Sequence, residues 1–325
     1  MHAIRQYEFG PATTLRHEEV PDPVPGTGQV RIAVAAAGVH LIDTTIRAGA
    51  AGLPFPLPEL PMTPGREVAG TVDALGDGVE ESWLGRHVVV HLGMASGGYA
   101  ELAVADVTAL HDVPDGLDDA AAVAMLGTGR MTQGILRVAQ LTADDVVLVT
   151  SAAGGIGTLL VQAAREIGAT VVGAAGGPTK TDRVRAAGAI AVDYRDPDWA
   201  DEVRAALGDR SASVVLDGVG GAAGRAAMDL LGPGGRLLMF GWSSGTPIEF
   251  TAADLFARGL SATVAIGPRI VGLPGGLRRL EEDSFAAAAA GRLVPAVTTY
   301  PLARAAEAHA ALESRATVGK VVLIP

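Results

Sequence analysis

The chain has no cysteine. This absence excludes disulfides, thiolate catalysis and every zinc site that is built on thiolates. Aromatic residues are scarce at 4%, whereas hydrophobic residues make up 49% of the sequence. The core must therefore consist mainly of Val, Leu, Ile and Ala. This amount of apolar material suits buried cores and argues against disorder.

Basic runs and long apolar runs are absent as well. The formal net charge is −11, so the sequence lacks the electrostatic footprint of a nucleic-acid-binding protein. No apolar run reaches the ~20 residues that span a bilayer. The first ten residues contain neither the charged nor the apolar region of a signal peptide. We therefore expect a cytoplasmic protein with neither a nucleic-acid partner nor a membrane partner.

The first third of the chain indicates a β-rich domain, and the length of 325 residues suggests that a second domain follows. Short strands broken by Gly and Pro are expected at Val30–Ala36, Glu67–Leu75, His87–Leu92 and Tyr99–Val104. Residues 49–64 contain five prolines and read as a long loop. A long ordered loop more often lines a site than simply joins two elements.

The pattern changes near residue 120, where Asp118–Leu141 reads as a helix. From Asp145 onward strands and helices alternate, and six strands with helical crossovers predict a doubly wound parallel sheet. Two further helices and the apolar strand Lys320–Ile324 end the chain, and we expect this tail to rejoin the first domain. The predicted division is residues 1–124 with 267–325, and residues 125–266.

A glycine-rich turn is the strongest chemical signal. It follows the apolar strand Asp145–Thr150, opens an amphipathic helix, and consists of Ala152, Ala153, Gly154, Gly155, Ile156 and Gly157. Small residues let the backbone turn tightly and let a pyrophosphate approach the amides at the helix N-terminus. An ordinary strand-to-helix turn is the alternative, but the repeating βα pattern around the turn favours a dinucleotide site.

The end of the next strand indicates which dinucleotide binds. A carboxylate there would bind the ribose 2′-hydroxyl of NAD, but residues 173–177 contain no acid. Lys180 and Arg183 follow, and Tyr194 ends the third strand. Cations facing an extra phosphate predict NADP(H), although solvated charges on a helix would give the same sequence.

Several ordered motifs resemble the medium-chain dehydrogenase/reductase superfamily, and specifically its zinc-free quinone oxidoreductase branch. They extend over nearly the whole chain. The motifs are residues 37–44, 64–70, 97–101, 152–157, 217–221, 240–245 and 312–320.

The resemblance implies an α/β protein with a GroES-like catalytic domain and a six-stranded Rossmann domain. It also implies an active site in the cleft between them and a homodimer joined through the Rossmann sheets. The catalytic residues implied are His40, Asp43 and Thr45. The cofactor contacts implied beyond the turn are Thr132, Val219, Gly241, Trp242 and Ser243.

The resemblance also concerns metal. Zinc-dependent relatives hold a catalytic metal with a Cys where His40 stands and a His where Arg66 stands. Arg66 cannot ligate a metal because a guanidinium stays protonated. A lone His is more often a hydrogen-bonded wall residue than a ligand, so we expect no metal site.

Three positions depart from the family pattern. Quinone reductases commonly have Asn at His40 and Tyr at Thr45, and their Gly-x-Thr-Ala-Tyr stretch appears here as residues 129–133. Hydride transfer from NADPH to a quinone is the expected reaction, because a quinone needs little general-acid help. An enone is the rival acceptor, with His40 as its proton donor. Asp43 reads equally well as a hydrogen-bonding wall residue, and a non-catalytic NADPH-binding protein is a further alternative.

Overall fold

The computed structural model describes residues 1–50, 56–93 and 95–325. Their contacts form two units, Met1–Gly127 with Pro295–Pro325 and Thr128–Val294, called here the first and second units. The expected loop at residues 49–64 lies partly outside the described residues. Every helix among the described residues is too short or too polar to cross a membrane.

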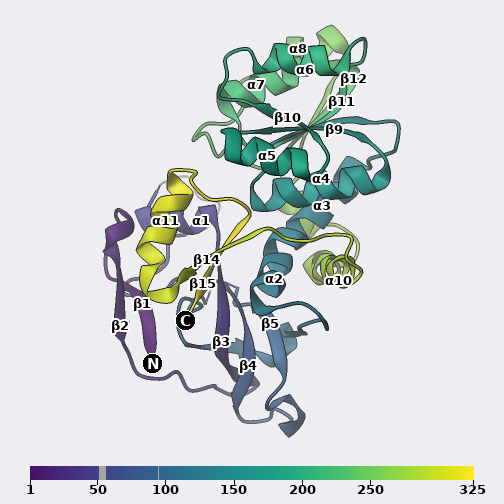
Figure 1. Ribbon diagram of the computed structural model, residues 1–325. Coiled ribbons are helices and arrows are strands. Elements are labelled where there is room, and N and C mark those ends of the chain that lie inside the picture. The colour runs from purple at the N-terminus through teal and green to yellow at the C-terminus, as the bar shows by residue number, and fades with distance from the viewer. Residues whose placement is uncertain (51–55, 94) are drawn as a thin grey trace. The chain divides into compact units, whose positions relative to one another are not determined.

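The first unit is built on a seven-stranded sheet with the order β14-β15-β3-β4-β5-β7, and β6 also pairs with β3 (Figure 1). A separate antiparallel pair, β1 and β2, completes its strands. The strands are β1 (His2–Gln6), β2 (Leu15–Glu19), β3 (Gln29–Val39), β4 (Glu67–Leu75), β5 (His87–His91), β6 (Leu102–Asp106), β7 (His111–Asp112), β14 (Val297–Pro301) and β15 (Lys320–Ile324). The helices are α1 (Leu41–Ala48), α2 (Asp119–Ala124) and α11 (Ala305–Glu313).

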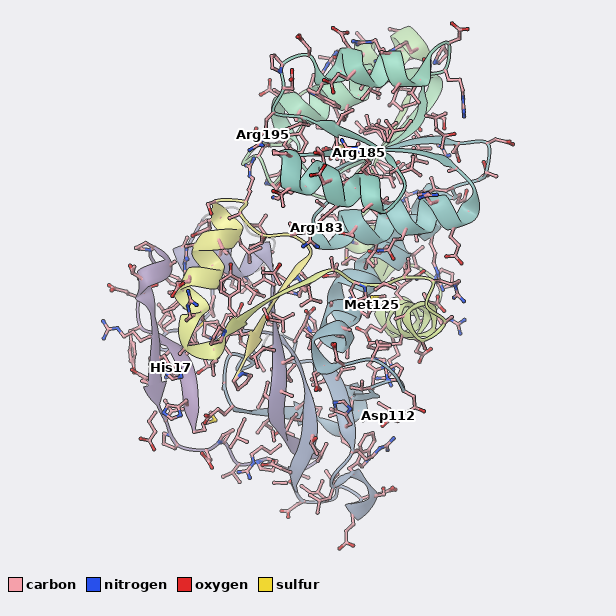
Figure 2. All side chains as sticks on the ribbon, viewed as in Figure 1. His17, Asp112, Met125, Arg183, Arg185 and Arg195 are labelled. Carbon is pink, nitrogen blue, oxygen red and sulfur yellow. The ribbon has the colours of Figure 1, made fainter. Side chains whose placement is uncertain are left out.

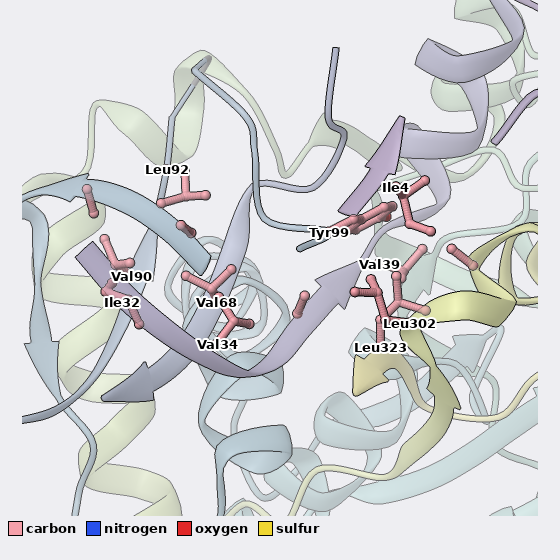
Figure 3. Close-up of a cluster of buried hydrophobic side chains, with 14 of the residues drawn as sticks. Ile4, Ile32, Val34, Val39, Val68, Val90, Leu92, Tyr99, Leu302 and Leu323 are labelled. Atoms are coloured by element: carbon pink, nitrogen blue, oxygen red, sulfur yellow. The ribbon is translucent and has the colours of Figure 1, made fainter. Parts of the chain in front are cut away.

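The tail of the chain closes this sheet, as the sequence predicts. β15 pairs antiparallel with β3, and β14 pairs parallel with β15. Alternate residues of β3 are buried along its first half, which is the pattern of a strand with one face on a core. Figure 3 shows this core, in which Tyr99 lies among Ile4, Val39 and Leu323.

The second unit is a six-stranded parallel sheet with the order β10-β9-β8-β11-β12-β13. This is the doubly wound order expected for a Rossmann sheet. The strands are β8 (Val146–Thr150), β9 (Thr170–Ala175), β10 (Ile190–Asp193), β11 (Ala212–Asp217), β12 (Leu231–Met239) and β13 (Ser261–Val264). The helices are α3 (Arg130–Ala139), α4 (Gly155–Ile167), α5 (Pro178–Ala186), α6 (Trp199–Leu207), α7 (Gly221–Asp229), α8 (Ala252–Arg258), α9 (Pro268–Val271) and α10 (Gly276–Ala289).

Helices cover both faces of this parallel sheet. In Figure 1, α6, α7 and α8 lie on one face and α4 and α5 on the other. β8 is buried at all of its positions, as its continuous apolar run predicts. The carboxyl ends of the parallel strands therefore meet at one edge, between two helical layers.

Two predictions about elements need correction. The helix expected over Asp118–Leu141 is broken into α2, a π-helical turn at Met125–Gly129, and α3. A Cβ at Gly127 would overlap the buried carboxylate of Glu67, so this turn is shaped around a charged neighbour. The sequence interpretation also placed no helix at Leu41–Ala48, where α1 forms.

Residues 267–294 belong with the second unit, although the sequence interpretation assigned them to the first. The reason is that α10 packs against α3. Two ion pairs join these helices, Arg130 with Glu281 and Arg137 with Asp283.

Candidate functional site

The glycine-rich turn has the geometry that a dinucleotide requires. It connects β8 to α4, a helix of 13 residues whose N-cap is Gly154. The amides of Gly155, Ile156 and Gly157 lie in the first turn of this helix, where N–H groups have no helical carbonyl to bind. Ala152 and Ala153 are buried beneath them. The N-terminus of α4 therefore presents amides and a positive dipole end to an anion.

Glycine is required at the end of this turn. A Cβ at Gly157 would overlap the carbonyl oxygen of Ser151, and Ser151 itself has a φ of 53°. The turn is also tied to the neighbouring strand, because the Thr150 hydroxyl donates to Asp217 at 2.6 Å and accepts from the Gly218 amide at 3.0 Å. Burial raises the pKa of Asp217 against the lowering effect of hydrogen bonds from the Thr150 hydroxyl and from the Val219 and Gly220 amides.

The end of β9 contains no carboxylate and faces cations and an aromatic ring. Gly177, with a φ of 96°, is the N-cap of α5, and Lys180 lies in the first turn of that helix. A Cβ on Gly176 would contact the Tyr194 ring at 3.3 Å, which places Tyr194 against the end of β9. Arg183 is exposed on α5. The structure thus brings Lys180 and Tyr194 to one edge.

Arg195 belongs to the same place, and the sequence interpretation missed it. Its guanidinium lies directly on Gly177, where a Cβ would overlap it. Asp193 holds it there, accepting from the Arg195 amide at 3.0 Å and from the side chain at 3.3 Å. Burial would raise the pKa of Asp193, but the hydrogen bonds from Arg195 and from the Gly177 amide lower it. Figure 2 labels Arg195 together with Arg183 of α5.

The loops after β11 and β12 are joined by backbone hydrogen bonds at the carboxyl edge of the same sheet. The amide of Ser243 donates to the Gly218 carbonyl at 3.1 Å, and the amide of Ser244 donates to the Val219 carbonyl at 2.8 Å. Val219, Gly241, Trp242 and Ser243 therefore lie together. Thr132 does not join them: it is fully buried, and its hydroxyl donates to the Thr128 carbonyl at 2.9 Å. A cofactor contact by Thr132 stays a prediction.

In the first unit, His40 meets two charged residues from distant parts of the chain. Its Nε2 lies 2.6 Å from a carboxylate oxygen of Glu67 and 2.7 Å from the Lys320 ammonium. Lys320 donates to the same Glu67 oxygen at 2.9 Å. When Nε2 carries a proton it donates to Glu67, and when it does not it accepts from Lys320. The ring of His40 therefore has a hydrogen-bond partner in either state.

Glu67 is fully buried and Lys320 is 4% exposed. Burial would raise the pKa of Glu67, but the charges of His40 and Lys320 hold it well below its ordinary value. This cluster does not suit zinc. The Lys320 ammonium already lies against Nε2 of His40 and the Glu67 carboxylate oxygen, the two atoms that could ligate a metal here. Arg66 cannot ligate a metal either. Groups of three or more metal-ligating His, Asp or Glu are not found among the described residues.

Asp43 is the centre of a second polar network in the first unit. It is 6% exposed and accepts from the His40 amide at 2.8 Å, from the Tyr99 hydroxyl at 3.2 Å and from Arg66 at 3.2 Å. Burial, and then the Asp43 carboxylate, raise the pKa of Tyr99 well above its ordinary value. The Tyr99 hydroxyl therefore stays protonated and donates a hydrogen bond to Asp43.

His309 of α11 lies behind Tyr99, with its Nε2 3.2 Å from the Tyr99 oxygen. Because the hydroxyl proton of Tyr99 points to Asp43, Nε2 of His309 must be the donor to this oxygen. Burial lowers the pKa of His309 to about 4, so the ring is neutral at pH 7. Arg66, Asp43, Tyr99 and His309 thus form one continuous hydrogen-bonded chain.

Asp43 and Arg66 also line a cavity of about 240 Å³ in the first unit. The loop of residues 56–64 contributes to its lining, as expected for a loop that walls a site. His40 and Thr45 are not among the described residues that line it, and Thr45 is half-buried on α1. Of the three predicted catalytic residues, Asp43 lines this cavity and His40 and Thr45 do not.

Sequence reasoning missed Glu67, Lys320 and Arg195 as members of these sites. Each was adjacent to a signal that was used: Glu67 follows Arg66, Lys320 ends the tail motif, and Arg195 follows Tyr194. A charged residue next to a motif residue was therefore the sequence signal that could have identified each of the three.

Family comparisons agree with this architecture. Residues 26–115 match the alcohol dehydrogenase GroES-like domain family, and residues 187–323 match the zinc-binding dehydrogenase family. Together the two matches include part of each sheet.

Three individual proteins resemble the chain over its full length. A quinone oxidoreductase from Sus scrofa is 33% identical, covering 100% of this chain and 98% of the relative. A 2-haloacrylate reductase from Burkholderia sp is also 33% identical, covering 100% of this chain and 99% of the relative. The solved structure of Escherichia coli quinone oxidoreductase complexed with NADPH superposes with a TM-score of 0.87 at 29% identity, covering 100% of both chains. The chain therefore belongs to the quinone oxidoreductase branch of the medium-chain dehydrogenase/reductase superfamily.

Proposed function

We propose that this protein is an NADPH-dependent quinone oxidoreductase that works without a metal. The observation that carries the proposal is the end of β9, where a carboxylate is missing and Lys180, Tyr194 and Arg195 gather around Gly176 and Gly177. This arrangement suits the 2′-phosphate that distinguishes NADPH from NADH. When bound there, NADPH would supply a hydride.

The residues of the second unit would hold the cofactor by its phosphates. The amides at the start of α4 would bind the pyrophosphate, and Lys180 and Arg195 would bind the 2′-phosphate. Arg183 would be an outer contact, because it is exposed on α5. The paired loops of Val219 and Gly241–Ser243 would contact the cofactor at the same edge.

The first unit would hold the acceptor. A quinone accepts hydride readily and its product is a stabilised phenolate, so orientation of the acceptor supplies most of the catalysis. We assign acceptor contacts to the segment that contains His40, Asp43 and Thr45. Asp43 acts from the cavity wall, where three donors fix its carboxylate.

An α,β-unsaturated carbonyl compound is the second candidate acceptor. The cluster of His40, Glu67 and Lys320 favours it, because reduction of such a compound needs a proton at the α carbon and Nε2 of His40 contacts both a carboxylate and an ammonium. The similarity to a 2-haloacrylate reductase points the same way.

NADPH oxidation with a panel of acceptors tests the proposal. Small quinones should be reduced faster than simple aldehydes, and primary alcohols should not be oxidised. Dominant alcohol oxidation would contradict the proposal. Tight NADPH binding without turnover of any quinone or enone would instead favour a non-catalytic NADPH-binding protein.

His40→Ala separates the two acceptors. General acid help contributes ~10²-fold or more, so the substitution should lower kcat by about that factor for an enone and much less for benzoquinone. A loss below roughly tenfold with the enone would make His40 a wall residue.

We also propose that the protein is a metal-independent homodimer. The purified protein should contain no stoichiometric zinc and should keep its activity with chelators. β13 ends the order of the parallel sheet, and Val264 on it is exposed, so this edge is the proposed interface. Light scattering that shows only a monomer would contradict the dimer.

A further inference from the structure

The cavity of the first unit is apolar over most of its wall. Its volume of about 240 Å³ is below the roughly 300–1,000 Å³ of typical ligand pockets, which suits a small acceptor with one ring. Ile46, Pro56, Pro58, Met62 and Pro64 form the apolar part. Charged side chains enter it at a few points only, so the direction of each one matters.

The charged residues of this wall differ in their surroundings. Arg47 is 2% exposed, and its guanidinium donates to the Gly10 carbonyl and to Glu313. Glu59 is exposed. The side chain of Arg66 is 16% exposed and lines the cavity while it pairs with Asp43. A guanidinium has five N–H donors in a planar fork, so it can hold one carboxylate and donate to a second oxygen.

The orientation of Arg66 is set by the chain of hydrogen bonds that begins at Asp43. Asp43 receives hydrogen bonds from the His40 amide and from the Tyr99 hydroxyl, and His309 in turn donates to Tyr99. Tyr99 and His309 are fully buried, so neither can turn toward solvent. A cation held by such a chain is preorganised, which is the property that makes electrostatic catalysis effective.

We infer that Arg66 is a catalytic residue that stabilises the oxyanion formed on the acceptor. The inference rests on the proposed function. When the acceptor gains a hydride from NADPH at a conjugated carbon, an electron pair of its conjugated system moves onto the carbonyl oxygen, which becomes an enolate oxygen. An enone is completed when a proton from water binds the α carbon. A quinone is completed when its sp³ ring carbon loses a proton and the oxygens take up protons from water, which restores the aromatic ring through the phenolate. Arg66 donates hydrogen bonds to the oxyanion and keeps its own protons, because a guanidinium is not deprotonated in proteins.

Arg66→Met tests the role in turnover. Removal of one donor to an oxyanion costs about 10²–10³-fold in kcat, so we expect a loss of that size with a small change in KM. Arg66→Lys keeps the charge without the planar fork and should lose less. Arg86→Met is the matched control, because Arg86 is a more exposed arginine of the same unit that pairs with Asp112.

A series of substituted benzoquinones distinguishes this role from a structural one. The loss in Arg66→Met should grow with the basicity of the product phenolate. An equal loss for every acceptor, or a loss below threefold, would overturn the inference. Because wild-type turnover with quinones is measured in the same series, failure of the proposed function would be recognised separately.

Binding of 4-nitrophenol gives a readout without cofactor or turnover. Its visible absorbance reports ionisation, so the wild type should bind the phenolate form and lower the pKa of the bound phenol. Arg66→Met should lose this pKa shift, and Arg66→Lys should keep part of it. Unshifted ionisation in the wild type would contradict the inference. If Arg66→Met fails to fold, Arg66→Lys and the wild type still decide the result.

Discussion

The phosphate turn of the second unit and the charged network of the first unit are built in opposite ways. The turn between β8 and α4 keeps its shape because Gly157 and the two alanines before Gly154 leave space for backbone groups. Around Glu67 and Asp43, by contrast, charged and polar side chains fill the space and hold one another. A substitution that adds a side-chain atom should therefore destabilise the turn, whereas a substitution that removes a charged group should destabilise the network.

The largest effect is expected from Lys320→Met, which leaves the Glu67 carboxylate fully buried without the ammonium that donates a hydrogen bond to it. Breaking a buried ion pair costs about 3–5 kcal/mol of unfolding free energy. Arg31→Met is the control, since Arg31 pairs with the partly exposed Asp73 on the same sheet, and such surface pairs are worth about 1 kcal/mol or less. Urea unfolding measures both. Equal costs would show that the network is no more sensitive than the surface.

The next effect concerns the edge at β9. A charge-assisted contact to phosphate is worth roughly 1.5–3 kcal/mol, which is about a 10- to 150-fold preference for NADPH over NADH. Lys180→Ala and Arg195→Ala should each raise the KM for NADPH and hardly change that for NADH. Arg183→Ala should do so more weakly.

Arg185→Ala is the control for these cofactor variants, because Arg185 lies on the same helix and pairs with Asp182 at the surface. The NADPH preference should also shrink at high salt, as expected for a partly exposed ion pair. Equal kcat/KM for the two cofactors in the wild type would contradict the assignment of this edge.

Substitutions at two glycines of the turn test the effect of an added atom. Gly157→Ala forces a Cβ against the Ser151 carbonyl, and overpacking of this kind costs about 1–3 kcal/mol. Gly154→Ala places its Cβ 3.1 Å from the Ser151 hydroxyl and 3.2 Å from the Ser151 carbonyl oxygen, which is much farther from that oxygen than the 2.1 Å at Gly157. We expect thermal unfolding to show a much smaller cost for Gly154→Ala. A reversed order would mean that packing against Ser151 does not shape the turn.

The effect that is smallest near neutral pH is a pH dependence that arises from His309. Its pKa is about 4 in the folded chain and 6.5 in the reference state. The unfolded chain therefore binds a proton first as the pH falls, and stability is lost between pH 6.5 and about 4. From pH 7 to pH 5 the loss should approach roughly 2 kcal/mol. His309→Gln keeps a donor and should remove this part of the loss. An unchanged pH dependence in that variant would place the titration elsewhere.

The second unit was largely predictable because its signals are local. The strand before Ser151, the small residues of the turn and the helix after it are adjacent in the sequence, and β8 and α4 confirm them. The strand order follows from the repeated βα pattern. The missing acid after β9 was also visible locally, whereas Arg195 was missed because its position on Gly177 depends on how two strand ends meet.

The first unit was predictable only as a class of fold. The sequence indicated its strands and the return of Lys320–Ile324, which pairs as expected. It did not indicate that Lys320 and His309 would enter the neighbourhood of His40 and Asp43, because partners of buried charges are set by tertiary pairing and not by spacing. Asp43 was left open between a catalytic residue and a wall residue, and in the structure it lines the cavity and orients Arg66.

The pairing of Glu67 with Lys320 has a consequence for the order in which the chain folds. The two residues are 253 positions apart, and the whole second unit is synthesised between them. At ~5–20 residues per second, Lys320 follows Glu67 out of the ribosome by roughly 10–50 s. β3 must wait for β15 over the same interval. The second unit is one contiguous segment of the chain and can fold without the tail. We therefore expect the second unit to fold before the first unit is complete.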